Sequence, residues 1–108
     1  MKSSKTEIEE DILKKCKQLV LELRGNQAGD GNAIINLEVI NQLHDELNQY
    51  KVQIKDKENV NKEMVGLLIY TCSRFYVQSK YSNNREELLK QFEKLNFALL
   101  ELYMSLDK

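Results

Sequence analysis

The chain has 108 residues, of which 42% are hydrophobic and 31% are charged, a composition typical of one soluble globular domain rather than a disordered segment. The formal net charge is −1, and Lys and Glu are interspersed along the chain, so the sequence lacks the basic face that binds nucleic acid. Because there is no proline and there are only four glycines, little interrupts a helix, and we expect a single all-α domain over residues 1–108.

The amino-terminal sequence begins with polar and acidic residues and does not resemble a secretory signal. The longest apolar run is far shorter than the roughly 20 residues that span a bilayer, so we expect a cytoplasmic protein. The two cysteines, Cys16 and Cys72, lack the spacing of a metal or redox motif. Each falls on an apolar helical stripe, which favours a packing role, and the sequence leaves a disulfide between them open.

The first expected helix begins after Thr6, which is spaced from Glu9 as in a capping box. It ends at Gly25, because glycine readily adopts the left-handed conformation found at helix ends. One apolar stripe recurs at helical spacing between these residues, and it consists of Ile8, Ile12, Cys16, Leu19, Val20 and Leu23. A polar loop follows over residues 25–32.

The second expected helix runs from near Asn32 to about Gln53. Its apolar residues recur in steps of three and four, and they are Ile34, Leu37, Ile40, Leu43, Leu47, Tyr50 and Ile54. The polar segment 55–61 then breaks the pattern. Asn59 or Asn61 is suited to cap the next helix, because a short side-chain acceptor satisfies its free amide groups.

The third expected helix spans roughly Val60 to Lys80, and residues 64–70 are apolar around nearly its whole circumference. A helix that is apolar all round is normally enclosed by others, so we expect its amino-terminal half to be buried on more than one side. Gly66 costs about 1 kcal/mol of helix propensity relative to alanine. Its presence indicates either the close approach of a neighbouring helix or simply a tolerated glycine.

The fourth expected helix opens at Asn83 or Asn84, after a short polar turn. Glu86 and Glu87 follow in its first turn, where the helix dipole favours negative charge. Its apolar stripe alternates in steps of four and three, and it consists of Leu88, Phe92, Leu95, Leu99, Leu102 and Leu106. Four helices of this length with short connections predict an antiparallel four-helix bundle.

The sequence offers no pattern typical of catalysis, and we expect a protein that is not an enzyme and binds no metal or cofactor. His44 is the only histidine, and the adjacent Asp45 and Glu46 project from other sides of its helix, so we expect it to be a half-exposed helical residue. There is no Glu-x-x-His pair and no glycine-rich phosphate loop. Ser73 has no neighbouring general base.

A binding surface is instead indicated by basic and aromatic side chains around the turn between the third and fourth expected helices. Tyrosine and arginine are enriched among the residues that dominate binding at protein interfaces. The candidate partner-binding residues are Arg74, Tyr76, Lys80, Tyr81 and Arg85. The alternative is that Tyr76 packs in the core while Lys80 and Arg85 only solvate the turn, and Tyr103 is similarly ambiguous.

The segment 67–95 resembles the immunity proteins against pediocin-like bacteriocins, the enterocin A immunity family. The third helix of that family is similar to LLIYTCSRFYVQSK at residues 67–80, an apolar run that ends on Lys80, and its fourth helix is similar to EELLKQFEKL at residues 86–95. The resemblance implies an antiparallel four-helix bundle of about this length. In the family the carboxyl-terminal half and its tail select the bacteriocin, and here we expect recognition to fall on the hairpin.

The function implied by the resemblance is non-catalytic protection of a bacteriocin-producing cell. The protein would bind, at the cytoplasmic face of the membrane, a sugar-transporter receptor that already holds the bacteriocin, and it would present residues 74–85 to that receptor. The alternative comes from another class: a small helical adaptor or a homodimerising interaction module that buries the face of its fourth helix. The sequence leaves the oligomeric state open.

Overall fold

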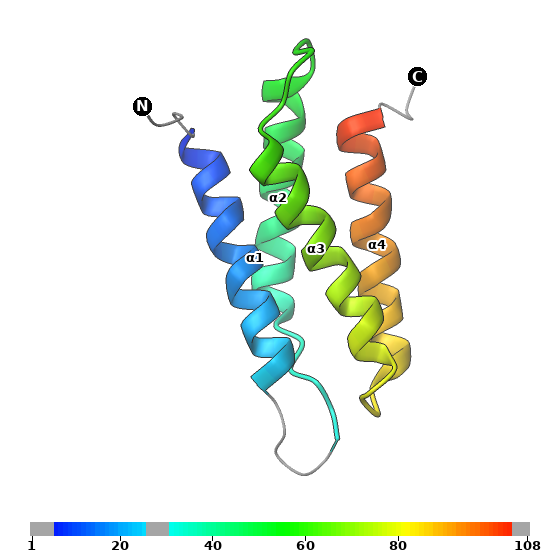
Figure 1. Cartoon of the computed structure of the whole chain (residues 1–108). Coiled ribbons are helices and arrows are strands. Elements are labelled where there is room, and N and C mark those ends of the chain that lie inside the picture. The colour runs from blue at the N-terminus through cyan, green and yellow to red at the C-terminus, as the bar shows by residue number, and fades with distance from the viewer. Residues whose placement is uncertain (1–5, 26–30, 105–108) are drawn as a thin grey trace.

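The computed structural model describes residues 6–25 and 31–104. Within these two ranges it contains no strand and four helices, which are α1 (Glu7–Gly25), α2 (Leu37–Ile54), α3 (Lys62–Ser79) and α4 (Arg85–Met104). Successive helices run in opposite directions along the bundle (Figure 1). The prediction of an all-α antiparallel four-helix bundle is therefore confirmed.

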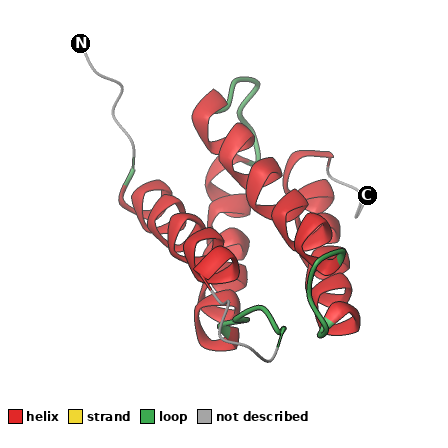
Figure 2. Ribbon diagram, turned by 60° about the horizontal axis from the view of Figure 1, so that its bottom comes forward, coloured by secondary structure: helices red, strands yellow, loops and turns green. Residues whose placement is uncertain are grey.

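The bundle consists of two antiparallel hairpins, α1–α2 and α3–α4, that lie side by side. α1 lies next to α2 and α3, and α4 lies next to α3 and α2, whereas no Cα atoms of α1 and α4, or of α2 and α3, come within 8 Å of each other. The connection over residues 55–61 therefore crosses a diagonal of the bundle. Segment 31–36 and the turn between α3 and α4 meet at the end that is brought forward in Figure 2.

The core lies along the middle of the bundle and confirms most of the predicted stripes. In α1 every predicted residue is buried except Ile8, which is half-buried. In α4 the four leucines Leu88, Leu95, Leu99 and Leu102 are buried, Phe92 is half-buried, and Leu106 lies outside the described residues. Cys16 and Cys72 are buried free thiols, so the packing role is confirmed and no disulfide joins them.

The predicted capping box at the start of α1 is confirmed. The backbone N–H of Thr6 donates to Glu9 Oε1 at 3.0 Å, and the backbone N–H of Glu9 donates to Thr6 Oγ1 at 3.2 Å. The helix ends at Gly25 as expected. Glu9 also accepts a hydrogen bond from the Tyr50 hydroxyl at 2.9 Å, so the amino-terminal turn of α1 is tied directly to α2.

The predicted start of the second helix near Asn32 is wrong by about five residues, because α2 begins at Leu37. Asn36 is its cap and accepts a hydrogen bond from the Val39 N–H at 3.1 Å. Residues 31–36 remain outside the helix because their backbone bonds to the α3–α4 turn instead. Ile34 in this segment and Leu37, the first residue of α2, are 45% and 49% exposed rather than part of a buried stripe.

The expectation that α3 is buried on more than one side is also wrong. α3 packs only against α1 and α4, so a single stripe is covered, and Ile69 and Tyr70 are 58% and 47% exposed. Apart from its chain neighbours and the backbone of α3, nothing lies within 4 Å of the position that a Cβ would take at Gly66, so no neighbouring helix closely approaches that glycine. Of the two predicted caps it is Asn61 that accepts from the Met64 N–H, at 3.1 Å.

Candidate functional site

Three of the five predicted binding residues line one hollow on the α3–α4 turn. Tyr76 and Lys80 come from the carboxyl-terminal end of α3 and Arg85 from the first residue of α4, and they surround a volume of about 410 Å³ together with Ser79 and Leu89. We call these five residues the tip hollow. Ser79 lies three residues after Tyr76, and Leu89 lies four residues after Arg85, so helical spacing alone would have added both to the predicted set.

Tyr76 organises one wall of the tip hollow through two contacts. The Lys80 Nζ lies 4.7 Å from the centroid of the Tyr76 ring, within the range of a cation–π interaction. The Phe92 ring lies 5.3 Å from the same ring at a tilt of 49°, an arrangement that aromatic pairs favour. Tyr76 is 42% exposed, so it is not a core residue, and its ring is held in place while part of it faces solvent.

Of the five residues that define the tip hollow, two are positively charged and none is negatively charged. Lys80 and Arg85 are exposed, and neither forms an ion pair with any residue that the structure describes. Among the residues that the structure describes, no carboxylate lines the volume. The Ser79 hydroxyl donates to the Tyr76 carbonyl oxygen at 2.6 Å, so it forms a fixed wall rather than a reactive group. The arrangement suits binding of an anion beside an apolar surface.

The other two predicted residues do not line the tip hollow. Arg74 is half-buried, and its guanidinium lies 3.5 Å from Gln78 Oε1. Its Nε is buried without a hydrogen-bond partner among the described residues. Tyr81 is 76% exposed and follows the last turn of α3. Both lie close to the tip hollow in sequence, and Tyr81 offers an open aromatic surface next to it.

The turn that carries the tip hollow is fixed by contacts that the sequence did not reveal. The backbone N–H of Asn83 donates to the carbonyl oxygen of Gly31 at 2.6 Å. The Asn84 side chain bonds to both backbone groups of Ala33 at 3.0 Å. Asn84 therefore occupies the position before α4, as predicted, but its side chain holds segment 31–36 rather than capping its own helix.

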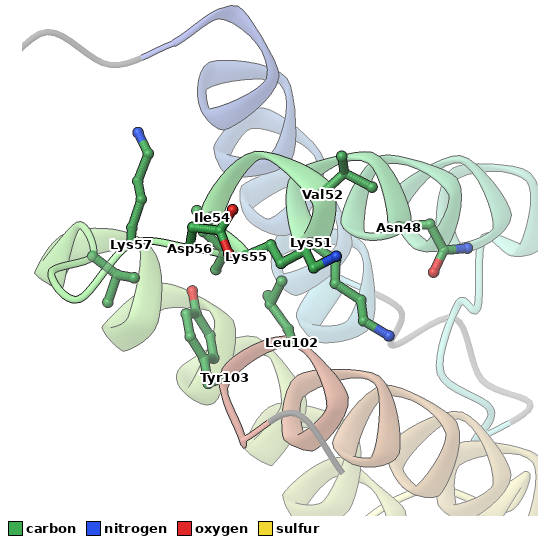
Figure 3. A pocket seen from close by; sticks show the side chains of 10 residues that line it. Asn48, Lys51, Val52, Ile54, Lys55, Asp56, Lys57, Leu102 and Tyr103 are labelled. Carbon is green, nitrogen blue, oxygen red and sulfur yellow. The ribbon is translucent and has the colours of Figure 1, made fainter. Parts of the chain in front are cut away.

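A second, larger hollow lies between the carboxyl-terminal ends of α2 and α4, and the sequence reasoning missed it. This groove of about 800 Å³ is lined by Lys51, Lys55 and Lys57, with Leu102 and Tyr103 pointing toward it from α4 (Figure 3). Its signal in the sequence is the run of lysines over residues 51–57. Cations near a helix carboxyl terminus interact favourably with the helix dipole. Lys51 and Lys55 can therefore stabilise α2 whether or not the groove binds a ligand.

Several titratable groups are buried inside the bundle. The hydroxyl of Tyr50 is buried against Glu9, and both burial and this hydrogen bond raise the pKa of Tyr50. Burial also raises the pKa of Tyr103 to about 12. Burial raises the pKa of Cys16 and of Cys72 to about 11, so neither is an activated thiolate nucleophile at neutral pH.

His44 is half-buried on α2, as expected. Burial and the positive charge of Lys94 lower its pKa, so it is neutral at physiological pH. Among residues 6–25 and 31–104, no three side chains of the metal-binding types gather at one point. In the same ranges, none of the helices has the length and apolar character needed to cross a bilayer.

Comparisons with family models, with curated proteins and with solved structures found no match to this chain. The site therefore stands on its own geometry. It is a hairpin tip with two cations that pair with no carboxylate among the described residues, one aromatic ring in contact with Lys80 and Phe92, and one leucine.

Proposed function

We propose that this protein is an immunity protein that protects its cell from a pediocin-like bacteriocin without catalysis. It binds, at the cytoplasmic face of the membrane, a sugar-transporter receptor that holds the bacteriocin, and so blocks the lethal pore. The proposal rests on the resemblance of residues 67–95 to the enterocin A immunity family. The observation that supports it most directly is the tip hollow, which lies on this same hairpin.

The fold suits a binding role at the hairpin tip because the tip is preorganised. α3 and α4 form the most extensive helix contact of the bundle, and the connecting turn is held by Asn83 and Asn84. A surface that is already ordered loses less conformational entropy on binding than a flexible one. Lys80 is likewise oriented by Tyr76 before any partner arrives.

Expression in a bacteriocin-sensitive bacterial strain tests the proposal. We expect the chain to raise the inhibitory concentration of at least one pediocin-like peptide in a broad panel. The double variant Lys80→Gln/Arg85→Gln should lose this protection, whereas Lys90→Gln, which removes an exposed charge of α4 outside the tip hollow, should retain it. An unchanged inhibitory concentration for every peptide, with the protein present at normal levels, would contradict the proposal.

A second candidate function is a homodimer or adaptor that uses the outer faces of α3 and α4. The observation that favours it is the exposure of large apolar side chains on both helices: Ile69, Tyr70, Phe97, Leu100 and Met104. Exposed apolar residues gathered on neighbouring elements often mark interaction surfaces. Light scattering over a range of concentrations tests it, with Phe97→Glu as the disrupting variant. A monomeric mass at all concentrations excludes the homodimer.

A further inference from the structure

The electrostatics of the tip hollow define the chemistry of what it binds. Lys80 and Arg85 both line it, and the structure describes no carboxylate that pairs with either. The nearest acidic residues in the sequence are Glu86 and Glu87, in the first turn of α4. Glu87 Oε2 accepts a hydrogen bond from Gln91 Nε2 at 3.0 Å, one turn farther along α4, and neither glutamate lines the hollow.

The remaining lining of the tip hollow consists of Tyr76, Leu89 and Ser79, and the Ser79 hydroxyl is already bonded to the Tyr76 carbonyl oxygen. Leu89 forms one wall, and the Tyr76 ring, backed by Phe92, forms another. The adjacent Tyr81 is largely exposed. A volume of about 410 Å³ accommodates a few side chains of an extended segment but not a packed helix or domain. The site therefore combines one place for negative charge with one place for an aliphatic or aromatic side chain.

We propose that the tip hollow binds an acidic peptide segment of a partner protein, in which a carboxylate lies between Lys80 and Arg85 and a neighbouring apolar side chain packs on Leu89 and Tyr76. This inference rests on the proposed function and specifies the chemistry of the receptor segment. Arginine pairs with carboxylates through two parallel hydrogen bonds, and the Lys80 ammonium is already positioned over Tyr76.

A phosphate group fits this site less well than a carboxylate. Phosphate sites usually supply several backbone N–H groups, often at a free helix amino terminus. Here the first turn of α4 carries Glu86 and Glu87, which oppose a dianion more strongly than a single carboxylate. A phosphate also leaves the apolar walls formed by Leu89 and Tyr76 uncovered.

The test is a titration followed by ¹H–¹⁵N NMR of the full chain. The probe is a capped hexapeptide of alternating leucine and glutamate, the matched control is the same peptide with glutamine in place of glutamate, and inorganic phosphate forms a third arm. We expect saturable shifts at the amides of the tip hollow with the acidic peptide only. Affinity should fall at least about tenfold in Lys80→Gln/Arg85→Gln, because both charge-assisted contacts with the carboxylate are lost, and it should persist in Lys90→Gln.

The outcomes separate this inference from the proposed function. Equal binding of the glutamine peptide, shifts with phosphate but not peptide, or no saturable shift at all would overturn the acidic-segment inference. If protection in cells still depends on Lys80 and Arg85 in that case, the proposed function survives and only its partner chemistry is wrong. Selective binding of the acidic peptide by a chain that protects no strain supports the site and contradicts the immunity function.

Discussion

The side chain of Asn84 forms two hydrogen bonds with the backbone of Ala33. Its Oδ1 accepts from the Ala33 N–H, and its Nδ2 donates to the Ala33 carbonyl oxygen, both at 3.0 Å. These residues are 51 positions apart in the sequence, and they join the segment that precedes α2 to the turn that precedes α4. One side chain thereby links the two hairpins at the end of the bundle that carries the tip hollow.

Asn84→Ala should destabilise the protein by about 1–3 kcal/mol. The substitution removes both hydrogen bonds and leaves the backbone groups of the buried Ala33 unpaired, and an unsatisfied buried polar group costs more than a surface bond contributes. Urea unfolding followed by circular dichroism measures the change. Asn96→Ala, an exposed asparagine on α4, is the control and should shift stability little. Equal stabilities for the two variants would show that the hydrogen bonds between Asn84 and Ala33 do not contribute to the free energy of unfolding.

The glycines at 31 and 66 should respond to alanine in opposite directions. Gly31 has φ +76, and a Cβ there would clash with the Asn83 side-chain amide. Gly31→Ala should therefore destabilise by about 1–2 kcal/mol from the left-handed conformation alone. Gly66 lies inside α3 with free space around it, so Gly66→Ala should stabilise by about 0.5–1 kcal/mol. Thermal unfolding of the two variants and of the unchanged protein measures both effects. A loss of stability in Gly66→Ala would contradict the open environment at that residue.

Local sequence patterns predicted the parts of the fold that depend on local interactions. The Thr6–Glu9 capping box and the stripes of α1 and α4 follow from residues three or four positions apart. The start of α2 was wrong because it depends on Asn84, which is distant in the sequence. The periodic apolar residues Ile34 and Leu37 continue the helical pattern, but the contact with Asn84 keeps residues 31–36 out of the helix.

The burial of α3 was misjudged for a similar reason. Hydropathy shows that residues 64–70 are apolar, but the number of neighbours depends on how the helices are arranged, and α3 has only two. Three of the five predicted binding residues line one hollow, because the basic and aromatic residues cluster around one turn, and their role in binding stays a prediction. What the sequence did not reveal is that Tyr76, Lys80 and Arg85 share one hollow while Arg74 does not. Whether a residue lines the hollow depends on the direction in which its side chain points from its helix.

Stability should fall with rising pH above about 9 because of the buried thiols. The pKa of Cys16 and of Cys72 is raised from 9.0 to about 11 by burial. Between these values the unfolded chain loses protons that the folded protein keeps, so the free energy of unfolding decreases as pH rises. The expected loss is about 1 kcal/mol per thiol between pH 9 and 10.

Urea unfolding at pH 7, 8, 9 and 10 measures this slope. The matched control is Cys16→Ala/Cys72→Ala, which should be less stable at pH 7 because it leaves cavities, yet should lose less stability between pH 9 and 10. Tyr50 and Tyr103, whose pKa values are both raised above 10 by burial, leave a smaller residual slope as pH approaches 10 in both proteins. Identical slopes in the two proteins between pH 9 and 10 would mean that the thiols are as accessible in the folded state as in the unfolded one.

Tyr50→Phe should cost about 1–3 kcal/mol although it removes a single oxygen atom. The Tyr50 hydroxyl, which is buried, donates to Glu9 Oε2 at 2.9 Å, and its loss leaves a carboxylate oxygen of a buried glutamate without this donor. Because Glu9 also accepts from the Thr6 N–H, the defect should loosen the first turn of α1, which hydrogen exchange detects as faster exchange there than in α4. Tyr81→Phe removes an equivalent hydroxyl from an exposed ring and should change neither stability nor exchange. If Tyr50→Phe behaves like Tyr81→Phe, water replaces the lost donor and the link between α1 and α2 does not depend on this bond.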